Sequence, residues 1–364
     1  MMSPGLYVHT PFCSRRCPYC DFYSISDLAK IPRWLEALER EVSHQSPYWT
    51  DLFGTVYVGG GSPSLLSPDQ LAGLKNALSK LKISPKAEIT LEANPEDVTA
   101  EKAQAWARWG FNRISLGAQS FQNQALSGPL GRGHSAEDIH QAIEIIRRSK
   151  LTLSLDLIFG WPGQSFQDWV DDLGLAVEAG VDHLSAYCLT PGPKSPLAKS
   201  YLDRTLTPIP EGQLADMFLE AGVFLKKRGF ERYEVANFAR RGAYSQHNLK
   251  YWRRDSYLGL GPSAHSFDGT RRSANVDCLE RWADSLGNGH TALSVIEDIT
   301  PEQAMMESLM LSLRLAEGAP LKWVKDQDQA QRLIQDGYLT QRGGTLKPTE
   351  KGFLNADYLA RVLT

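Results

Sequence analysis

The chain has 364 residues, of which 42% are hydrophobic and 22% charged, and its formal net charge at pH 7 is −3. This composition is typical of a globular protein with a large core and room for a second, smaller unit, and it excludes a disordered chain. The slight negative charge argues against broad binding of a phosphate backbone, and no apolar stretch is long enough to span a bilayer. We therefore expect neither a nucleic-acid-binding protein nor an integral membrane protein.

Short runs rich in β-branched and aromatic residues alternate with stretches of helical apolar spacing. The predicted strands are Leu6–His9, Thr55–Val58, Glu88–Glu92, Arg113–Gly117, Leu153–Phe159 and His183–Leu189. The predicted helices between them are Pro32–His44, Pro68–Leu81, Ala100–Trp109, Ala136–Ser149 and Phe166–Ala179. This alternation predicts parallel strands joined by crossover helices. Six such units favour an α/β fold with an open, partial (β/α)6 barrel over a closed eight-stranded one.

Beyond about residue 230 the pattern changes, and the last part of the chain predicts a small winged-helix-like unit. Its predicted elements are helices at Met305–Leu315 and Leu321–Asp336, strands at Gly337–Gln341 and Gly344–Lys347, and a final helix after Thr349. We expect a barrel core over residues 1–235, a connecting region over 236–300 and this unit over 301–364. Because it has no basic recognition helix, we expect a packing or partner module rather than a DNA reader.

Glycines, carboxylates and amides stand where the predicted strands end. They include Gly59–Ser62, Glu92 and Gln119, and the carboxyl ends of parallel strands form one face of such a barrel. Asp156 lies in an otherwise apolar strand, where a carboxylate needs a partner: a ribose hydroxyl pair, or a structural arginine such as Arg132. The glycines alone are also consistent with a plain tight turn. Together these residues favour a nucleoside site at one mouth.

Three cysteines stand near the start of the chain, Cys13, Cys17 and Cys20, in a C-x3-C-x2-C spacing with Tyr19 before the last. Three thiolates leave one iron of a four-iron cluster without a protein ligand and free to bind a small molecule. Five cysteines in so long a chain argue against a disulfide framework, and reduced thiols meant for a metal fit a cytoplasmic location. A structural zinc site with His9 as fourth ligand remains an alternative.

The cysteine spacing resembles that of radical S-adenosylmethionine (SAM) proteins. The wider set of motifs resembles the HemN-like, oxygen-independent coproporphyrinogen III oxidase branch of that superfamily, and is most similar to its HemW-type heme chaperones. The matching segments are Tyr7–Cys13, Gly59–Ser64, Glu92 with Asn94-Pro95, Ser115–Phe121, Arg132, Leu155–Gly160 with Pro162–Gln164, Glu234 with Asn237-Phe238, and His247–Trp252. They run from the start of the chain to its last third.

This resemblance implies a [4Fe-4S] cluster on the three cysteines, with SAM chelating the fourth iron and contacted by Tyr7, Gly60 and Glu92. It implies reductive cleavage of that SAM, with electrons from a donor such as flavodoxin or ferredoxin. The residues implied to line the neighbouring pocket, where some relatives hold a second SAM, are Tyr19, Gly61, Ser62, Gln119, Arg132 and Asp156.

The H-N-x-x-Y-W run at His247–Trp252 points to heme, because the resembling branch binds it. His247 is the natural axial ligand, and Tyr251 and Trp252 offer flat faces to a porphyrin. The alternative is an ordinary hydrogen-bonded loop histidine. The resemblance also implies a heme-acceptor protein, for which a membrane-associated respiratory protein is one candidate.

Three functions follow in order of preference. The first is a heme chaperone that binds cluster, SAM and heme and transfers heme to an acceptor. The second is an oxygen-independent coproporphyrinogen III oxidase (dehydrogenase). Those enzymes carry a longer segment before the cluster and a further cysteine where this chain has Phe22. Both differences favour the chaperone. The third is radical modification of tRNA, but the sequence shows no basic RNA-binding extension of the kind that we would expect for it.

Overall fold

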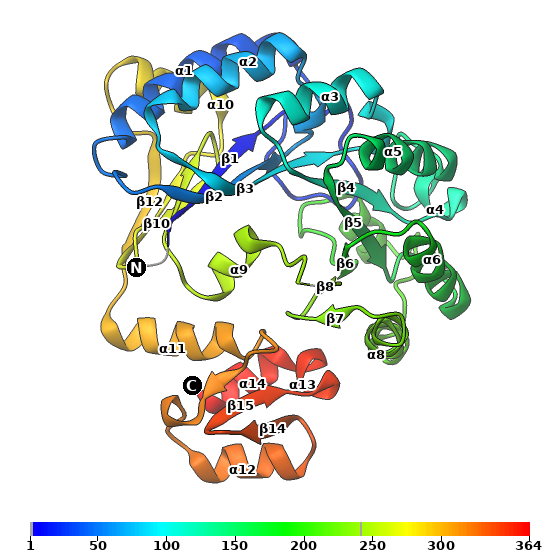
Figure 1. The fold of residues 1–364 in the computed structure, drawn as a ribbon. Coiled ribbons are helices and arrows are strands. Elements are labelled where there is room, and N and C mark those ends of the chain that lie inside the picture. Colours follow the sequence, from blue (N-terminus) through cyan, green and yellow to red (C-terminus); the bar gives the residue numbers. More distant parts are fainter. Residues whose placement is uncertain (1–2, 241) are drawn as a thin grey trace. The chain divides into compact units, whose positions relative to one another are not determined.

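The computed structural model describes residues 3–240 and 242–364, which group into two compact units. The first unit comprises the chain up to Ser154, Thr190–Thr205 and Asp255–Asp298; the second comprises Leu155–Leu189, Leu206–Arg254 and Ile299–Thr364. Both contain strands and helices, as the sequence predicts (Figure 1). The domain division predicted at residues 235 and 300 stays a prediction. Within the described ranges, no helix is long and apolar enough to cross a membrane.

The first unit is built on a sheet with the strand order β12-β11-β10-β9-β1-β2-β3-β4. The strands are β1 (Gly5–Thr10), β2 (Phe53–Gly60), β3 (Ile83–Ala93), β4 (Arg113–Gln119), β9 (Tyr257–Leu260), β10 (His265–Phe267), β11 (Arg271–Asn275) and β12 (Leu293–Asp298). Strands β1 to β4 are parallel neighbours in chain order, which confirms the predicted parallel arrangement for them. The sequence prediction did not include β9, which pairs with β1 in parallel, or the antiparallel strands β10 to β12.

Helices follow the strands of the first unit. They are α1 (Ile31–Gln45), α2 (Pro68–Ala77), α3 (Ala100–Trp109), α4 (Asn123–Ser127), α5 (Ala136–Arg148), α7 (Pro196–Leu202) and α10 (Leu279–Gly287), with short 3-10 turns at Leu28–Lys30, Pro63–Leu65, Leu78–Lys80 and Pro95–Asp97. Side-chain capping fixes several starts: Ser67 and Ser135 each accept a hydrogen bond from the N3 backbone of α2 and α5 in a capping box. The predicted helix Pro68–Leu81 ends earlier, at Ala77, and its last turn is 3-10.

The second unit contains β5 (Thr152–Phe159, whose first three residues belong to the first unit), β6 (His183–Cys188), β7 (Glu231–Arg232) and β8 (Asn237–Ala239), in the order β5-β6-β8-β7. Its helices are α6 (Phe166–Glu178), α8 (Glu211–Lys226), α9 (Gln246–Trp252), α11 (Pro301–Ser312), α12 (Gln327–Gln335), α13 (Glu350–Leu354) and α14 (Ala356–Leu363). A small separate sheet with the strand order β13-β15-β14 (Ala319–Pro320, Thr345–Pro348, Leu339–Arg342) follows α11 in the chain.

The predicted helix Leu321–Asp336 is wrong as one element. Residues Leu321–Trp323 form a 3-10 turn, and a separate helix, α12, begins at Gln327. The break has a local cause, because the Asp326 side chain accepts a hydrogen bond from the backbone N–H of Gln329 and so caps a new helix start. The helices and strands of the C-terminal part pack around a buried apolar cluster that includes Leu313, Leu333 and Leu346.

One face of strands β1 to β4 is polar. The register aligns Tyr7 with Tyr57, Tyr57 with Thr90 and Thr90 with Arg113, so these alternate residues share a face. The residues between them, such as Val58, are buried among apolar side chains. Parallel strands covered on both faces usually read as continuous hydrophobic runs. The alternation therefore identifies the polar face of this sheet as the candidate location of a functional site.

Candidate functional site

The loop that carries the three cysteines follows β1 and is closed at its base. The N–H of Ile25 donates to the carbonyl of Pro11 at 2.6 Å, and the N–H of Cys13 donates to the carbonyl of Ile25 at 3.0 Å. Within the loop, the N–H of Cys20 donates to the carbonyl of Cys17 at 3.1 Å, which forms a tight turn between the last two cysteines. All three are part-buried free thiols, and burial raises the pKa of Cys13 and Cys20. Binding to a metal would deprotonate them.

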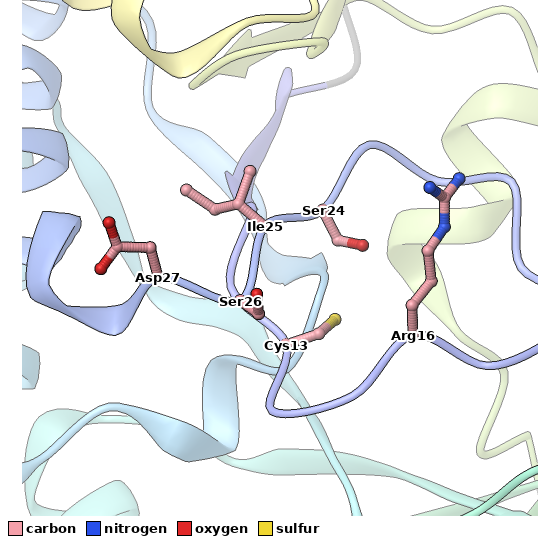
Figure 2. Close-up of a pocket in the computed structure, with 6 residues that line it drawn as sticks. All are labelled: Cys13, Arg16, Ser24, Ile25, Ser26 and Asp27. Carbon is pink, nitrogen blue, oxygen red and sulfur yellow. The ribbon is translucent and has the colours of Figure 1, made fainter.

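A pocket of about 310 Å³ lies beside the first cysteine. Its lining consists of Cys13, Arg16, Ser24, Ile25, Ser26 and Asp27 (Figure 2). This volume is at the lower end of the range for small-ligand pockets. The structure thus leaves space next to the Cys13 sulfur, between the start of the loop and its returning segment.

The glycine run Gly59–Gly61 is needed for the packing of the chain itself. A Cβ on Gly59 would lie 2.8 Å from the Glu92 carboxylate, and one on Gly60, whose φ is +107°, would lie 2.3 Å from His9 Nδ1. A Cβ on Gly61 would lie 2.5 Å from a main-chain oxygen at the start of the cysteine loop. Side chains at these positions would therefore displace Glu92, the His9 ring and the start of the cysteine loop. Contact of Gly60 and Gly61 with SAM stays a prediction.

Glu92 is held at the end of β3 by two donors. The Tyr57 hydroxyl donates to Oε1 at 2.8 Å, and the backbone N–H of Gly60 donates to Oε2 at 2.9 Å. The ring of Tyr57 stacks on that of Tyr7, with 6.2 Å between the ring centroids. The structure therefore brings together the three residues predicted to contact one SAM, and adds Tyr57. The strand alternation that aligns Tyr57 with Tyr7 was the sequence signal for it.

His9 has no ring nitrogen left for a metal. Its Nδ1 is 3.0 Å from the Tyr7 hydroxyl and its Nε2 is 2.9 Å from the carbonyl oxygen of Tyr23. Burial lowers the pKa of His9 to about 4, so the ring is neutral. In the described part of the chain, no three His, Cys, Asp or Glu side chains converge on a single ion position. The engagement of both His9 nitrogens does not support His9 as the fourth ligand of a zinc site.

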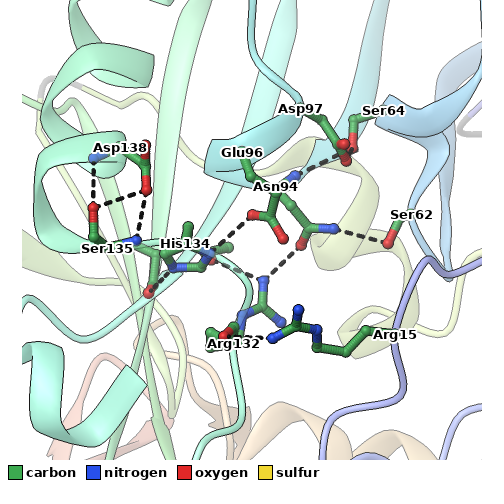
Figure 3. Close-up of polar contacts among 12 residues, drawn as sticks. Arg15, Ser62, Ser64, Asn94, Glu96, Asp97, Arg132, His134, Ser135 and Asp138 are labelled. Carbon is green, nitrogen blue, oxygen red and sulfur yellow. Dashed lines mark hydrogen bonds and ion pairs between the residues drawn. The ribbon is translucent and has the colours of Figure 1, made fainter. Parts of the chain in front are cut away.

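A chain of polar side chains connects two of the cysteines, and we call it the thiol-linking arc: Ser62, Asn94 and Arg132 (Figure 3). The Ser62 hydroxyl is 3.7 Å from Cys13 Sγ, and Asn94 Nδ2 donates to Ser62 Oγ at 2.8 Å. Arg132 Nη2 donates to Asn94 Oδ1 at 2.6 Å, and Arg132 Nη1 donates to Cys17 Sγ at 3.3 Å. The sequence prediction included Ser62 and Arg132 as pocket residues but gave no role to Asn94.

Arg132 is also connected to other predicted pocket residues. Its Nη1 lies 3.4 Å from the Tyr19 hydroxyl. Its Nη2 donates to the carbonyl of Gly117, and the Gln119 amide folds back over that same glycine, 2.8 Å from where a Cβ would stand. Gln119 has a φ of 69°, a conformation that is uncommon for a residue with a side chain. Because Gly117 has no side chain, the side chains of Gln119 and Arg132 have room beside it.

Arg132 has one donor left over. Its Nε is buried and has no hydrogen-bond partner among the residues that the structure describes. An arginine side chain is always charged, so this orphan donor fits an anionic group such as the carboxylate of an amino acid. Behind it, Arg15 Nη1 donates to the Arg132 carbonyl at 2.9 Å. Neighbouring His134 bonds Glu96 Oε2 at 2.9 Å and the Ala118 carbonyl at 3.0 Å, so both of its nitrogens are engaged.

The remaining predicted site residues lie in the second unit. Asp156 is a part-buried residue of β5. His247 lies in α9 and is buried, and its Nε2 is 2.8 Å from the Tyr251 hydroxyl. Burial, with the nearby Lys250, lowers the pKa of His247 to about 3. Trp252 packs part-buried against a small apolar cluster. Heme ligation through Nε2 would require the His247–Tyr251 bond to open, so this role stays a prediction.

Comparison with known proteins assigns the family. Residues 7–176 match the radical SAM superfamily and residues 299–354 match the HemN C-terminal domain. The chain is 35% identical to the heme chaperone HemW of Mycobacterium tuberculosis over 99% of this chain and 94% of that protein. It is 32% identical to the HemW of Bacillus subtilis over 87% and 84% of the two chains.

The fold is that of a solved structure, coproporphyrinogen III oxidase (HemN) from Escherichia coli, described as a radical SAM enzyme. The TM-score is 0.85 at 23% identity, over 99% of this chain and 90% of that one. This likeness confirms the predicted fold class, an α/β radical SAM fold with a small C-terminal domain. The chain therefore belongs to the HemW-type proteins in the HemN-like branch of the radical SAM superfamily.

Proposed function

We propose that this protein is a heme chaperone that binds a [4Fe-4S] cluster, SAM and heme, and transfers heme to an acceptor protein in the cytoplasm. The observation that carries the proposal is its 35% identity, over nearly the full length of both chains, to a protein described as a heme chaperone. Likeness to the HemN structure shows the fold alone and does not favour the oxidase alternative.

The residues present fit a cluster with one open iron. Cys13, Cys17 and Cys20 would be its ligands, and two of the three sulfurs already have a hydrogen-bonding neighbour in the thiol-linking arc. Hydrogen bonds to ligand sulfur are a usual feature of iron–sulfur sites. When bound, the cluster supplies the electron that cleaves the SAM sulfonium, and an electron donor such as flavodoxin or ferredoxin would reduce it.

The residues around the cysteine loop also fit SAM. Glu92, at the end of β3 and oriented by Tyr57 and by the Gly60 N–H, would recognise an ammonium group with its carboxylate oxygens. The orphan Nε of Arg132 would suit the carboxylate of an amino acid. We propose Glu92 for the methionine end of SAM, and Arg132 and Gln119 for the neighbouring pocket.

The cluster is tested by anaerobic reconstitution with iron and sulfide. We expect about four irons per chain and a charge-transfer absorption in the wild type, because three thiolates hold a four-iron cluster. Cys17→Ala should abolish both, while Cys188→Ala, an exposed cysteine of the second unit, should leave both unchanged. Stoichiometric zinc with no iron in the anaerobically purified wild type would refute the cluster.

Heme binding is tested by titration with heme and observation of its Soret band. A shifted Soret band that is lost in His247→Ala but kept in His290→Ala, an exposed histidine, would support His247 as ligand. An unchanged spectrum in His247→Ala would move the ligand elsewhere, and His265, an exposed residue of β10, is then the next to substitute.

Chaperone and oxidase are separated by the product. The cluster-loaded protein is incubated anaerobically with SAM, a reductant and coproporphyrinogen III, and the porphyrins are separated afterwards. The proposal expects no decarboxylated product, and transfer of heme to an acceptor in a parallel assay. Stoichiometric loss of propionate carboxyls, or restored heme synthesis in a strain lacking the oxidase, would reverse this order.

A further inference from the structure

The thiol-linking arc has only one consistent arrangement of hydrogens. A guanidinium group can donate but not accept, so the oxygen of the Asn94 amide must face Arg132. The amide nitrogen of Asn94 must then face Ser62, and it donates to Ser62 Oγ at 2.8 Å. Ser62 has a single hydroxyl hydrogen, and with its oxygen accepting from Asn94, that hydrogen is left for Cys13 Sγ at 3.7 Å.

The other end of the arc is equally directed. Arg132 Nη1 donates to Cys17 Sγ at 3.3 Å, while Nη2 of the same group is held by Asn94 and by the carbonyl of Gly117. Both ends of the arc thus point a hydrogen at a cysteine sulfur. A thiolate that ligates a metal can only accept, so binding of a cluster would fix this direction and not reverse it.

Asn94 is the residue that couples the two ends, and its own backbone is fixed. Its N–H lies 3.2 Å from Ser64 Oγ, and the Ser64 hydroxyl donates to Asp97 Oδ2 at 2.6 Å. The residue after it is the buried Pro95, which restricts the backbone of Asn94 to an extended conformation, as observed. The amide is therefore held in place before any ligand arrives.

We propose that Asn94 is a positioning residue that aims two hydrogen-bond donors, Ser62 and Arg132, at the sulfurs of Cys13 and Cys17, and thereby raises the reduction potential of the cluster. This inference rests on the proposed cluster site. The physical reason is that donors and positive charge at ligand sulfur stabilise the extra electron of the reduced cluster. The effect is on the ease of reduction, and not on whether three thiolates are present.

The decisive variant is Asn94→Asp, which keeps the size of the side chain and removes its two N–H donors. A carboxylate at this position accepts from both neighbours, so the Ser62 hydroxyl turns toward it and Cys13 loses the Ser62 donor, while the hydrogen bond from Ser24 remains. The added negative charge acts in the same direction. We expect the ratio of reduced to oxidised cluster at a fixed applied potential to fall about tenfold, a shift of about 59 mV for a one-electron couple.

The measurement is an anaerobic redox titration of reconstituted protein, followed by electron paramagnetic resonance and normalised to bound iron. Asn76→Asp makes the same chemical change on the exposed side of α2 in the same unit and should leave the potential unchanged. If Asn94→Asp does not load iron, Ser62→Ala removes one donor only and should lower the ratio in the same direction by a smaller factor.

The outcomes separate this inference from the proposed function. A wild type that binds no cluster overturns both. A wild type that binds about four irons while both Asn94→Asp and Ser62→Ala keep its potential overturns the positioning role alone and leaves the cluster site intact. A potential that falls equally in Asn76→Asp also overturns it, since a general charge effect would then account for the shift.

Discussion

Glu234 carries a stability penalty that depends on pH. It lies between β7 and β8, is 0% exposed, and neither of its carboxylate oxygens has a hydrogen-bond partner of good geometry among the described residues. Its main chain is bridged to Leu315, just after α11, and the neighbouring Val235 N–H donates to the carbonyl of Arg314 at 3.0 Å. Burial raises the pKa of Glu234 to about 7, although the nearby Ala236 N–H, the Asn237 side chain and the charge of Arg232 oppose the rise.

The sign of the effect follows from where the proton is bound. Below pH 4.5 the carboxyl is protonated in both states and has no effect. Between pH 4.5 and 7 the unfolded chain releases the proton while the folded chain keeps it, so stability falls as the pH rises. Above pH 7 both are ionised and the folded state bears the full cost. The rise in the pKa of Glu234 from 4.5 to about 7 corresponds to about 3 kcal/mol.

Glu234→Gln removes this ionisation and keeps the shape of the side chain. Its carboxamide can also donate to Asn237 Oδ1, which has no partner in the described part of the chain. Relative to the wild type, we expect the variant to gain about 2 to 3 kcal/mol between pH 5 and pH 8. Urea unfolding of the cluster-free chain, measured across this range by tryptophan fluorescence, gives the free energies of unfolding.

The control is Glu178→Gln, which removes an exposed carboxyl at the end of α6 in the same unit. It should not change the pH dependence, since an exposed carboxyl is in contact with water in both the folded and the unfolded chain. The reasoning is refuted if the stability curves of Glu234→Gln and the wild type run parallel from pH 5 to pH 8.

Three further changes test the site and its support. Gly61→Ala places a methyl group against main-chain oxygens of the cysteine loop, so we expect a loss of about 1–3 kcal/mol in stability and less iron retained per chain after gel filtration. Tyr57→Phe removes a hydrogen-bond donor from Glu92, so calorimetry should show that the cluster-loaded protein binds SAM roughly fivefold more weakly. An unchanged affinity would show that orientation of Glu92 by Tyr57 does not contribute to SAM binding. Arg232→Met breaks the ion pair with Glu350 and the stacking of the guanidinium on nearby phenylalanines. We expect the free energy of unfolding to fall by about 3 kcal/mol and the C-terminal segment to become more sensitive to proteolysis. An unaltered cleavage rate would contradict this.

Local pattern was sufficient for strands β1 to β4 and for helices α1, α2, α3 and α5 of the first unit. The helices combine apolar spacing with side-chain caps at α2, α3 and α5, and both signals lie within a few residues; the short helix α4 was not predicted. The sequence prediction missed β9 to β12. For β9 the reason is that it has only four residues and pairs with β1, some 250 residues earlier in the chain, so no local pattern marks it. The predicted helix Leu321–Asp336 failed because the cap at Asp326 was overlooked.

By itself, the sequence determined the three cysteines, the loop that holds them, the parallel strands and, by resemblance, the family. Only the tertiary structure decided how the polar residues at the strand ends are used. It showed that His9 is occupied by Tyr7 and Tyr23, and that Asn94 links Ser62 to Arg132. The reason is physical: residue type fixes what a side chain can donate or accept, whereas strand register and loop packing, which depend on contacts far apart in the chain, fix which neighbour it meets.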